Sequence, residues 1–524
     1  MAVEFSAIQD AYQDSVKLMR VSSDISQAFG VDEAFAVMGT DENKRLLIDS
    51  DLMEESTLAE FDPNDLVLVV RDDDPDTAAE ALAEMEERIR GTQERQDSDE
   101  GDGEGPPRSF YGALTRLPDA NMVSISVPGE YATREAWKAL QEGLHVHIFS
   151  DNVSIEDERK LKAYGQENDR LVMGPDCGSA IINGSPLGFA NDVDEGSIGV
   201  VAAAGTGLQE VTTLVDRAGA GVSQAIGTGG RDLQDEVGGT TMTQGMRMLT
   251  DDEDTEVVLL VSKPPDKETM NAFLEEVADC PKPVVVEFIG SDAGPVEDAG
   301  GIAADSLADA ARRAVLELPG REGDVTFDAG LDVFTTPDRG EDIVAERGSP
   351  DSARQYLRGL YSGGTLTTEA VTLLEDELGE IASNTGAGSD LAADETPDGH
   401  AITDLGADEF TRGRPHPMID STVRDDRLRQ ALESEDTLVI LLDLVLGYSA
   451  HDDPAGAIVD VLEEADHGEW PLVVASVCGT TRDPQPWEAQ IQKLVDAGVY
   501  VAESNADAAR LTGNVLAATE GDQS

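Results

Sequence analysis

The feature that constrains the fold most is an internal repeat. Three pairs of segments recur in the same order, and the two segments of each pair share a pattern of glycine and apolar residues. These pairs are residues 205–211 with 364–370, residues 257–265 with 438–445, and residues 282–286 with 470–474. Such a repeat indicates tandem copies of one structural unit. Since each copy combines strand-like apolar runs with helical stripes, the sequence predicts two related α/β domains in tandem.

Alternation of strand and helix also precedes the repeat. Apolar runs at residues 122–127 and 146–149 flank a helical stretch at residues 134–142, and another run follows at residues 198–202. This alternation implies parallel strands joined by right-handed crossovers. We therefore expect an α/β protein made of several doubly wound units.

Composition marks the borders of these units. Residues 91–107 have almost no apolar content and cannot contribute to a core, and residues 320–350 form a loose stretch between the two copies. At 524 residues the chain is too long for one core. The predicted segments are a small α/β module at residues 1–90, an acidic linker at 91–110, a doubly wound domain at 111–194, and the two repeat copies at 195–318 and 349–522.

The formal net charge is -70, from 107 acidic and 37 basic residues spread over the whole chain. An acidic tail for a basic partner would concentrate this charge in one segment. A dispersed acidic surface is typical of halophilic proteins, which work where the Debye length falls to about 3 Å at 1 M salt. Because no basic stripe is present to neutralise phosphates, nucleic acid is excluded as a partner.

The sequence also bounds the cellular location. The three cysteines lie far apart, which predicts neither a disulfide framework nor a cysteine metal site. Residues 1–20 carry three acidic side chains where a signal peptide would be apolar, and no apolar run of about 18 residues occurs. We therefore expect a cytoplasmic protein with no membrane partner and no metal.

A glycine-rich turn opens each repeat copy and is a candidate phosphate site. In the first copy the strand at residues 198–202 is predicted to turn into a helix beginning near Leu208. Free backbone N–H groups and the positive end of a helix dipole attract anions there. The alternative is a tight turn that needs glycine only for its φ angle. The candidate phosphate-binding residues are Gly205, Thr206 and Gly207 in the first copy, and Gly364 and Thr365 in the second.

A glutamate follows each turn at the same spacing, Glu210 in the first copy and Glu369 in the second. Both are predicted to lie in the first turn of their helices. A carboxylate at that position can serve as an ordinary cap, because it favours the helix dipole. The alternative is a catalytic role beside a bound anion.

A second glycine-rich loop ends in Gly229, Gly230 and Arg231. The planar guanidinium of Arg231 is suited to a carboxylate or phosphate ligand. The alternative is a structural salt bridge between Arg231 and Asp232 or Asp235.

Two further residues are candidates of a different kind. His416 occupies the corresponding place in the second copy, between two prolines. Histidine can act as a base or nucleophile near neutral pH, but in this setting it can also be a rigid loop element. Cys177 follows a strand-like run, and a free cysteine is by default a buried small apolar residue; a reactive or ligand-contacting role is the alternative.

Together these motifs resemble the FdrA proteins of the succinyl-CoA ligase α-subunit and acyl-CoA synthetase superfamily. The resemblance covers essentially the whole chain. The matching motifs are residues 13–16, 38–40, 174–178, 189–191, 204–210, 226–233, 262–265, 413–420 and 479–484.

The resemblance implies a CoA-binding Rossmann domain at residues 111–194 and two succinyl-CoA-ligase-like domains of flavodoxin type in the repeat. It further implies that the turn at residues 204–210 begins a helix whose N-terminus holds the phosphate of a phosphohistidine steadied by Glu210. Coenzyme A is then the expected cofactor, and a nucleotide would bind only through a partner. The implied CoA or ligand contacts are Pro175, Asp176, Cys177, Gly229 and Gly230.

The sequence departs from this pattern in the loop at residues 290–302, which contains no histidine. A glycine-rich fingerprint at the head of the CoA domain and a nucleotide-binding ATP-grasp domain are also missing. We expect an acyl-CoA synthetase-like protein that handles an acyl phosphate or CoA thioester with other subunits, with Glu210, Glu369 and Arg231 as catalytic candidates. The alternatives are a transferase subunit that uses an acyl or carbamoyl phosphate without phosphohistidine, and a non-catalytic ligand-binding subunit.

Overall fold

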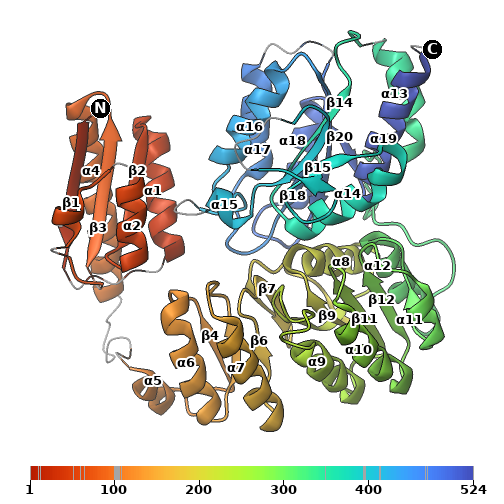
Figure 1. The fold of residues 1–524 in the computed structure, drawn as a ribbon, viewed down its shortest axis with the longest axis horizontal. Coiled ribbons are helices and arrows are strands. Elements are labelled where there is room, and N and C mark those ends of the chain that lie inside the picture. The colour runs from red at the N-terminus through yellow and green to blue at the C-terminus, as the bar shows by residue number, and fades with distance from the viewer. Residues whose placement is uncertain are drawn as a thin grey trace. The chain divides into compact units, whose positions relative to one another are not determined.

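The computed structural model groups the chain into two compact units (Figure 1). The first comprises Met1–Ala120 and Thr411–Asp420, and the second comprises Asn121–Phe410 and Ser421–Ser524. The five segments predicted from composition divide the chain more finely and stay predictions. The residues described by the structure are 2–9, 11, 13, 15–50, 52–59, 61–63, 65–98, 107, 109–348, 350–392, 397–411, 415–465, 468 and 470–522.

The first unit is built on a three-stranded antiparallel sheet in the order β1-β3-β2. Apolar side chains of α1 and α4 pack on one face of this sheet, and those of α2 and α3 pack on the other. The central strand β3 is therefore its most buried strand. The elements are β1 (Ala2–Ile8), α1 (Ser15–Phe29), β2 (Glu33–Met38), α2 (Asp41–Asp49), α3 (Glu55–Leu58), β3 (Leu66–Asp72), α4 (Pro75–Ser98) and α5 (Phe110–Arg116).

The start of the predicted linker is helical instead of irregular. Helix α4 continues through residues 91–98 to Ser98, because Gln, Glu and Arg are good helix formers. Residues 99–106 and 108 of that linker lie outside the described residues.

The second unit begins with a small parallel sheet in the order β4-β5-β6. The strands and helices predicted from alternation are confirmed here. Within the part of the chain that the structure describes, no helix is both long and apolar enough to cross a bilayer. The elements are β4 (Met122–Ile125), α6 (Gly129–Gln141), β5 (His145–Ile148), α7 (Ile155–Glu167) and β6 (Val172–Met173).

A seven-stranded sheet follows, in the order β13-β12-β11-β9-β10-β7-β8. Its first five strands in that order are parallel, whereas the hairpin β7–β8 pairs antiparallel with β10. The elements are β7 (Ser179–Ile182), β8 (Ser185–Gly188), β9 (Glu195–Ala203), α8 (Gly205–Arg217), β10 (Val222–Gly227), α9 (Thr240–Asp251), β11 (Val257–Ser262), α10 (Lys267–Asp279), β12 (Val284–Phe288), α11 (Gly294–Asp298), β13 (Ile302–Ala303) and α12 (Leu307–Leu316).

The second seven-stranded sheet has the order β16-β15-β17-β14-β18-β19-β20. Every residue of the interior strand β18 is buried, which explains the continuous apolar run in the sequence. The elements are a 3₁₀ turn (Pro337–Arg339), α13 (Gly340–Arg347), β14 (Tyr356–Tyr361), α14 (Gly364–Leu378), β15 (Ile381–Ser383), β16 (Ser389–Asp390), β17 (His400–Asp404), α15 (Asp408–Thr411), α16 (Thr422–Glu433), β18 (Thr437–Val445), α17 (Pro454–Glu464), β19 (Leu472–Cys478), α18 (Trp487–Asp496), β20 (Tyr500–Ala502) and α19 (Asn505–Asp522).

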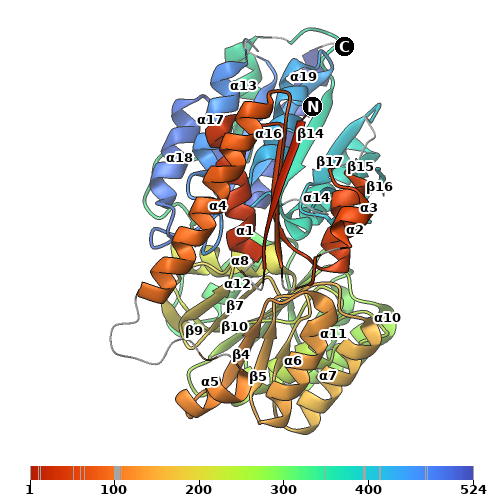
Figure 2. The same cartoon turned by 90° about the vertical axis from the view of Figure 1, so that its left-hand side faces the viewer.

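The two large sheets confirm the internal repeat. The order β13-β12-β11-β9-β10 in one sheet matches β20-β19-β18-β14-β17 in the other, strand for strand along the chain. Helices α8 and α12 of the first copy contact α14 and α19 of the second, and these helices lie between the two sheets (Figure 1 and Figure 2). The repeat thus places the two glycine turns on a common interface.

Candidate functional site

The first turns of helices α8 and α14 touch at the interface between the two repeat copies. A Cβ added to Gly207 would lie 2.8 Å from Cγ2 of Thr365, and one added to Gly363 would lie 2.6 Å from Oγ1 of Thr206. The missing side chains of these glycines therefore allow the close approach. Each strand turns into its helix at the first glycine of its motif, Gly205 or Gly364, so the predicted phosphate-binding residues come together.

The N-terminal N–H groups of both helices are free for a ligand. Neither Ala204 nor Gly363, which precede the helices, makes a side-chain capping hydrogen bond. Among the described residues, no acceptor contacts the backbone N–H of Gly205, Thr206 or Gly364. The first N–H groups of a helix need an external acceptor, and the two helix dipoles add their positive ends at the same place. This arrangement can bind an anion.

Lys263 and Asp404 place opposite charges at the start of α14. A Cβ added to Gly364 would lie 3.1 Å from Nζ of Lys263 and 2.6 Å from Oδ2 of Asp404. Burial raises the pKa of Asp404, whereas the N–H of Gly406 and the charge of Lys263 act to lower it. Sequence reasoning did not select either residue as a site residue. The available signal was a lysine directly after a buried strand in a chain with few basic residues.

The second glycine loop packs directly against the segment that carries Cys177. A Cβ on Gly229 would clash with the carbonyl oxygen of Pro175, and one on Gly230 would lie 3.9 Å from Oδ2 of Asp176. The five predicted ligand contacts therefore form one cluster. Cys177 is buried, and desolvation raises the pKa of its thiol to about 12. Its environment favours the structural alternative for this residue.

Asp176 has an unusual electrostatic environment. Its side chain keeps contact with solvent, yet desolvation by the surrounding protein, followed by the carboxylates of Asp151 and Asp408, raises its pKa to about 6. The charges of Arg231 and Lys263 act in the opposite direction. Since the charge of Lys263 changes the pKa of Asp176, the ligand-contact cluster lies close enough to the start of α14 for the two to interact electrostatically. A carboxyl group with this pKa can exchange a proton near neutral pH.

The structural alternative for Arg231 named the wrong partners, since neither Asp232 nor Asp235 forms a salt bridge with it among the described residues. Arg231 pairs instead with Glu158 of α7, at 2.9 Å between Nη2 and Oε2. Asp232 pairs with Lys162 at 2.7 Å, and Lys162 and Glu158 also pair with each other. Glu158 and Lys162 are one turn apart on α7 and so face the loop together. The loop is thereby fixed by a buried ionic network that local sequence spacing does not reveal.

Glu210 and Glu369 lie in the second turn of their helices, not in the first. The predicted position was wrong because α8 begins at Gly205 and not near Leu208. Oε1 of Glu210 accepts the backbone N–H of Asn505, at 3.0 Å, and Oε1 of Glu369 accepts that of Leu307, at 2.6 Å. These are the first residues of α19 and α12. Each glutamate therefore caps a helix of the other repeat copy.

Asn505 connects the two glutamates, because its backbone N–H donates to Glu210 and its side chain donates to Glu369. Its amide donates to Oε2 of Glu369 at 2.7 Å and accepts the hydroxyl of Tyr361 at 3.0 Å. Glu210 and Glu369 are 1% and 2% exposed. Desolvation raises the pKa of Glu210 and raises that of Glu369 to about 7. The two carboxylates thus share Asn505 as a partner, and neither forms a hydrogen bond with the N-terminal N–H groups of α8 or α14 among the described residues.

His416 belongs to the first unit. Nδ1 of its imidazole accepts the N–H of Met418 at 3.2 Å, and its carbonyl accepts the N–H of Ile419 at 2.7 Å. Burial lowers the pKa of His416 to about 4. This geometry favours the loop-element alternative. Its neighbours at residues 412–414 lie outside the described part of the chain.

A hollow of about 540 Å³ lies at the N-termini of α6 and α7 and is lined by Gly129, Arg134, Trp137 and Ser154. Helix N-termini, an aromatic ring and a guanidinium are groups that bind the nucleotide part of a ligand such as coenzyme A. Glu130 and Asp157 also line the hollow, and their negative charges disfavour the binding of an anion there.

Two family descriptions match parts of the chain. Residues 360–515 match the family described as CoA-ligase, and residues 1–106 match the AllF heavy metal-associated domain.

The N-terminal match raises the question of a metal. Residues 1–106 contain no cysteine and no histidine, the ligands that soft metals prefer, so they do not fit such an ion.

Several known proteins are similar to the chain. The succinate–CoA ligase [ADP-forming] subunit alpha 1 of Archaeoglobus fulgidus is 29% identical over 183 residues, which is 34% of this chain and 60% of that protein. An ATP citrate lyase from Methanothrix soehngenii, solved with citrate and coenzyme A, is 12% identical, and the match covers 79% of each chain with a TM-score of 0.36.

The Escherichia coli (strain K12) protein YahF, described as uncharacterized, is 37% identical over 513 residues, which is 96% of this chain and 97% of YahF. The match therefore spans both units. The chain belongs to the same family as YahF, with a CoA-ligase domain in its C-terminal part and an AllF-type domain at its N-terminus.

Proposed function

We propose that the chain binds an acyl phosphate at the paired N-termini of α8 and α14 and transfers the acyl group to an acceptor. One observation carries the proposal: two uncapped helix N-termini touch, and the ammonium of Lys263 lies at one of them. An ammonium beside the positive end of a helix dipole is electrostatically unfavourable unless an anion joins them. The carboxylate of Asp404 beside Gly364 supplies part of that negative charge, and a phosphate group would supply the rest.

The chemistry requires a phosphate site and a proton acceptor. The acceptor's lone pair attacks the acyl carbon, the bond from that carbon to the phosphate oxygen breaks, and phosphate leaves with the electron pair. The N–H groups of Gly205, Thr206 and Gly364, together with Lys263, would stabilise the charge on the leaving phosphate. Asp176, with its pKa of about 6, would take the proton that the acceptor loses.

Transfer without a phosphohistidine agrees best with the local structure. The loop at residues 290–302 has no histidine, and its first residue, Gly290, lies against Thr372 in the middle of α14. Glu210 and Glu369 are already occupied as helix caps. The two groups that a phosphohistidine mechanism would need at the helix N-termini are therefore absent or committed elsewhere.

We further propose that the chain works with other subunits in the cytoplasm of a halophilic cell, as a member of the FdrA branch. The similar succinate–CoA ligase chains are named as alpha subunits, which supports a partner subunit. A second candidate function is acyl-CoA synthesis, with the acyl group passed to coenzyme A. The hollow beside Arg134 and Trp137 favours this candidate.

Titration calorimetry with acetyl phosphate and carbamoyl phosphate in about 2 M KCl tests the phosphate site. We expect the Lys263→Met variant to bind either compound about tenfold more weakly, since a charge-assisted contact contributes about 1.5–3 kcal/mol. Lys267→Met is the matched control, because Lys267 is exposed on α10. Equal affinities in wild type and Lys263→Met would refute the proposed site.

Coenzyme A distinguishes the two functions. Binding of coenzyme A that weakens in Trp137→Ala would support acyl-CoA synthesis. Binding of acyl phosphate without measurable binding of coenzyme A would support transfer to another acceptor. Binding of neither compound would leave a non-catalytic subunit as the correct alternative.

A further inference from the structure

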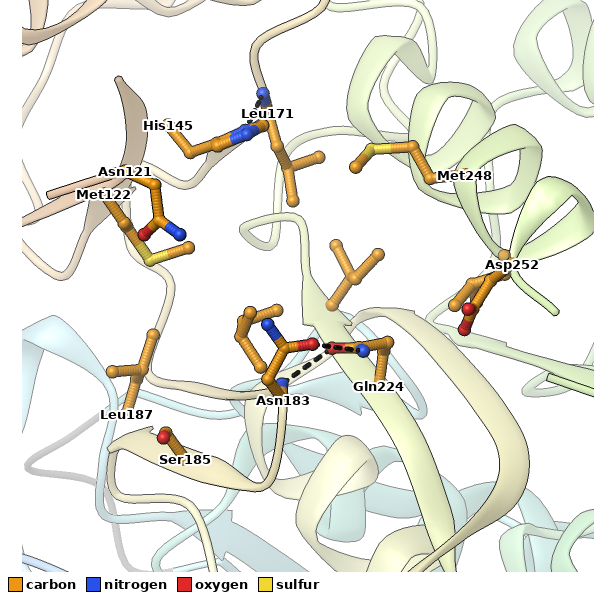
Figure 3. A pocket seen from close by; sticks show the side chains of 13 residues that line it. Asn121, Met122, His145, Leu171, Asn183, Ser185, Leu187, Gln224, Met248 and Asp252 are labelled. Atoms are coloured by element: carbon orange, nitrogen blue, oxygen red, sulfur yellow. Dashed lines mark hydrogen bonds between the residues drawn. The ribbon is translucent and has the colours of Figure 1, made fainter. Parts of the chain in front are cut away.

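A second cavity, of about 510 Å³, lies between the small sheet β4-β5-β6 and the hairpin end of the first large sheet (Figure 3). Its volume is within the range of small-molecule sites. Figure 3 shows Met122 and Leu187 on one side, and Leu171 and Met248 on the other. Met248 is 41% exposed. The apolar lining side chains are Met122, Leu171, Ile182, Leu187, Ile226, Met248 and Leu249.

Polar groups in the cavity wall are held in fixed positions. Gln224 exchanges two hydrogen bonds with Asn183, each of 2.8 Å, and these tie the β7–β8 turn to β10 (Figure 3). Nδ1 of His145 accepts the N–H of Leu171 at 2.9 Å. The proton of the neutral ring is therefore on Nε2, for which no partner exists among the described residues. Asn121 adds a side-chain amide to the same wall.

The charges around the cavity define the kind of ligand. No lysine or arginine lines it, and Asp252 does. Burial and the charge of Arg170 both lower the pKa of His145, which keeps the ring neutral. The lining therefore offers no positive side chain to balance an anion, and the carboxylate of Asp252 disfavours one. An uncharged ligand with a mainly apolar body and hydrogen-bond acceptors matches the apolar wall and the N–H donors of His145 and Asn121.

We propose that this cavity is a binding site for an uncharged, mainly apolar small molecule. It is separate from the phosphate site, because His145 and Met122 begin their strands whereas the phosphate site lies beyond the strand ends. Ile226 lines the cavity on β10, and the same strand ends at Gly227, where the Gly229–Arg231 loop starts. Met122, His145 and Leu171 place most of this wall where strands β4, β5 and β6 begin.

Methionine methyl NMR tests the proposal on the intact protein. The chain has 12 methionines, and two of them, Met122 and Met248, line the cavity. The probe is N-phenyl-1-naphthylamine, which is uncharged and mainly apolar. We expect saturable shifts of the Met122 and Met248 methyl signals, and binding at least about tenfold weaker for the anionic analogue 8-anilinonaphthalene-1-sulfonate. Absence of saturable shifts at these two methyls, or equal affinity for the sulfonate, would overturn the proposal.

A cavity-filling variant provides the second test. Met248→Trp should reduce the affinity for the neutral probe at least about tenfold, and its partly exposed position on α9 makes it compatible with folding. Leu316→Trp is the matched control, since Leu316 is a similarly exposed apolar residue, 38% accessible, on α12. Equal losses in the two variants would mean that the probe binds nonspecifically and would also overturn the proposal.

Discussion

Glu287 shows how strongly the interface between the repeat copies changes a single side chain. It lies on β12 and is 3% exposed, and its Oε2 has no hydrogen-bond partner among the described residues. Desolvation, followed by the nearby carboxylates of Glu369, Asp305 and Asp309, raises its pKa to about 9. At neutral pH this glutamate therefore carries a proton.

The raised pKa predicts a pH-dependent stability. The folded protein holds the Glu287 proton up to about pH 9, whereas the unfolded chain releases it near the ordinary value of 4.5. Glu287 therefore makes its full contribution to the free energy of unfolding at low pH. That contribution falls by about 1.4 kcal/mol per pH unit as the pH rises between these two values. As the pH rises from 5 to 9, the free energy of unfolding of Glu287→Gln should increase relative to that of wild type. Urea unfolding in molar salt measures both values. The exposed Glu297→Gln should show no such trend.

At the residue scale, the sequence predicts the glycine turns well because a missing side chain is itself the signal. Gly207 and Gly229 are needed where another residue approaches their Cα closely. Asn505 and Lys263 were not predicted as partners of the site. Asn505 is 295 residues away from Glu210, which contacts its N–H, and no local pattern encodes such a distance.

At the scale of elements, the contact between α8 and α14 depends on one small side chain more than on helix propensity. Gly207→Ala places a methyl group 2.8 Å from Thr365, while Gly205→Ala meets no atom within 4 Å. We expect Gly207→Ala to lower the free energy of unfolding by about 1–3 kcal/mol, the usual cost of overpacking, and to weaken acyl phosphate binding. Gly205→Ala should stay close to wild type in both measurements, and equal effects would contradict the described contact.

The N-terminus of α19 supports a second prediction. Asn505→Ala removes the amide that donates to Glu369 and Leu366 and accepts from Tyr361. Because buried groups are left unpaired, we expect a loss of about 2–4 kcal/mol in the free energy of unfolding. The control on the same helix is Asn514→Ala, whose amide donates to Pro337 at the surface. Similar losses in both variants would show that the Asn505 network contributes nothing specific.

At the scale of the whole molecule, charge dominates. A chain with 107 acidic and 37 basic residues repels itself in dilute buffer. We expect the thermal unfolding midpoint, followed by circular dichroism, to rise between about 0.2 M and 2 M KCl, because salt screens this repulsion. A midpoint that does not change with salt would contradict the assignment of a halophilic surface.

The overall architecture could be predicted because the order of apolar and polar residues along the chain shows both the alternation of strands and helices and the internal repeat. The repeat predicts that the two large sheets share a strand order, although it does not predict what that order is. The hairpin β7–β8 was not predicted in the first large sheet, since residues 179–188 precede the repeat and β7 pairs antiparallel with β10. Pairing across separate sequence blocks depends on tertiary packing, which local periodicity does not contain.

The exchanged helix caps of Glu210 and Glu369 make the two halves of the chain mutually dependent. If either half folded alone, it would keep a carboxylate without its donor and a helix start without its acceptor. Only correctly paired halves satisfy both at once. The interface is therefore complete only when both halves have folded and paired. Because one polypeptide carries both halves, the two sides of the proposed anion site are always present in equal number.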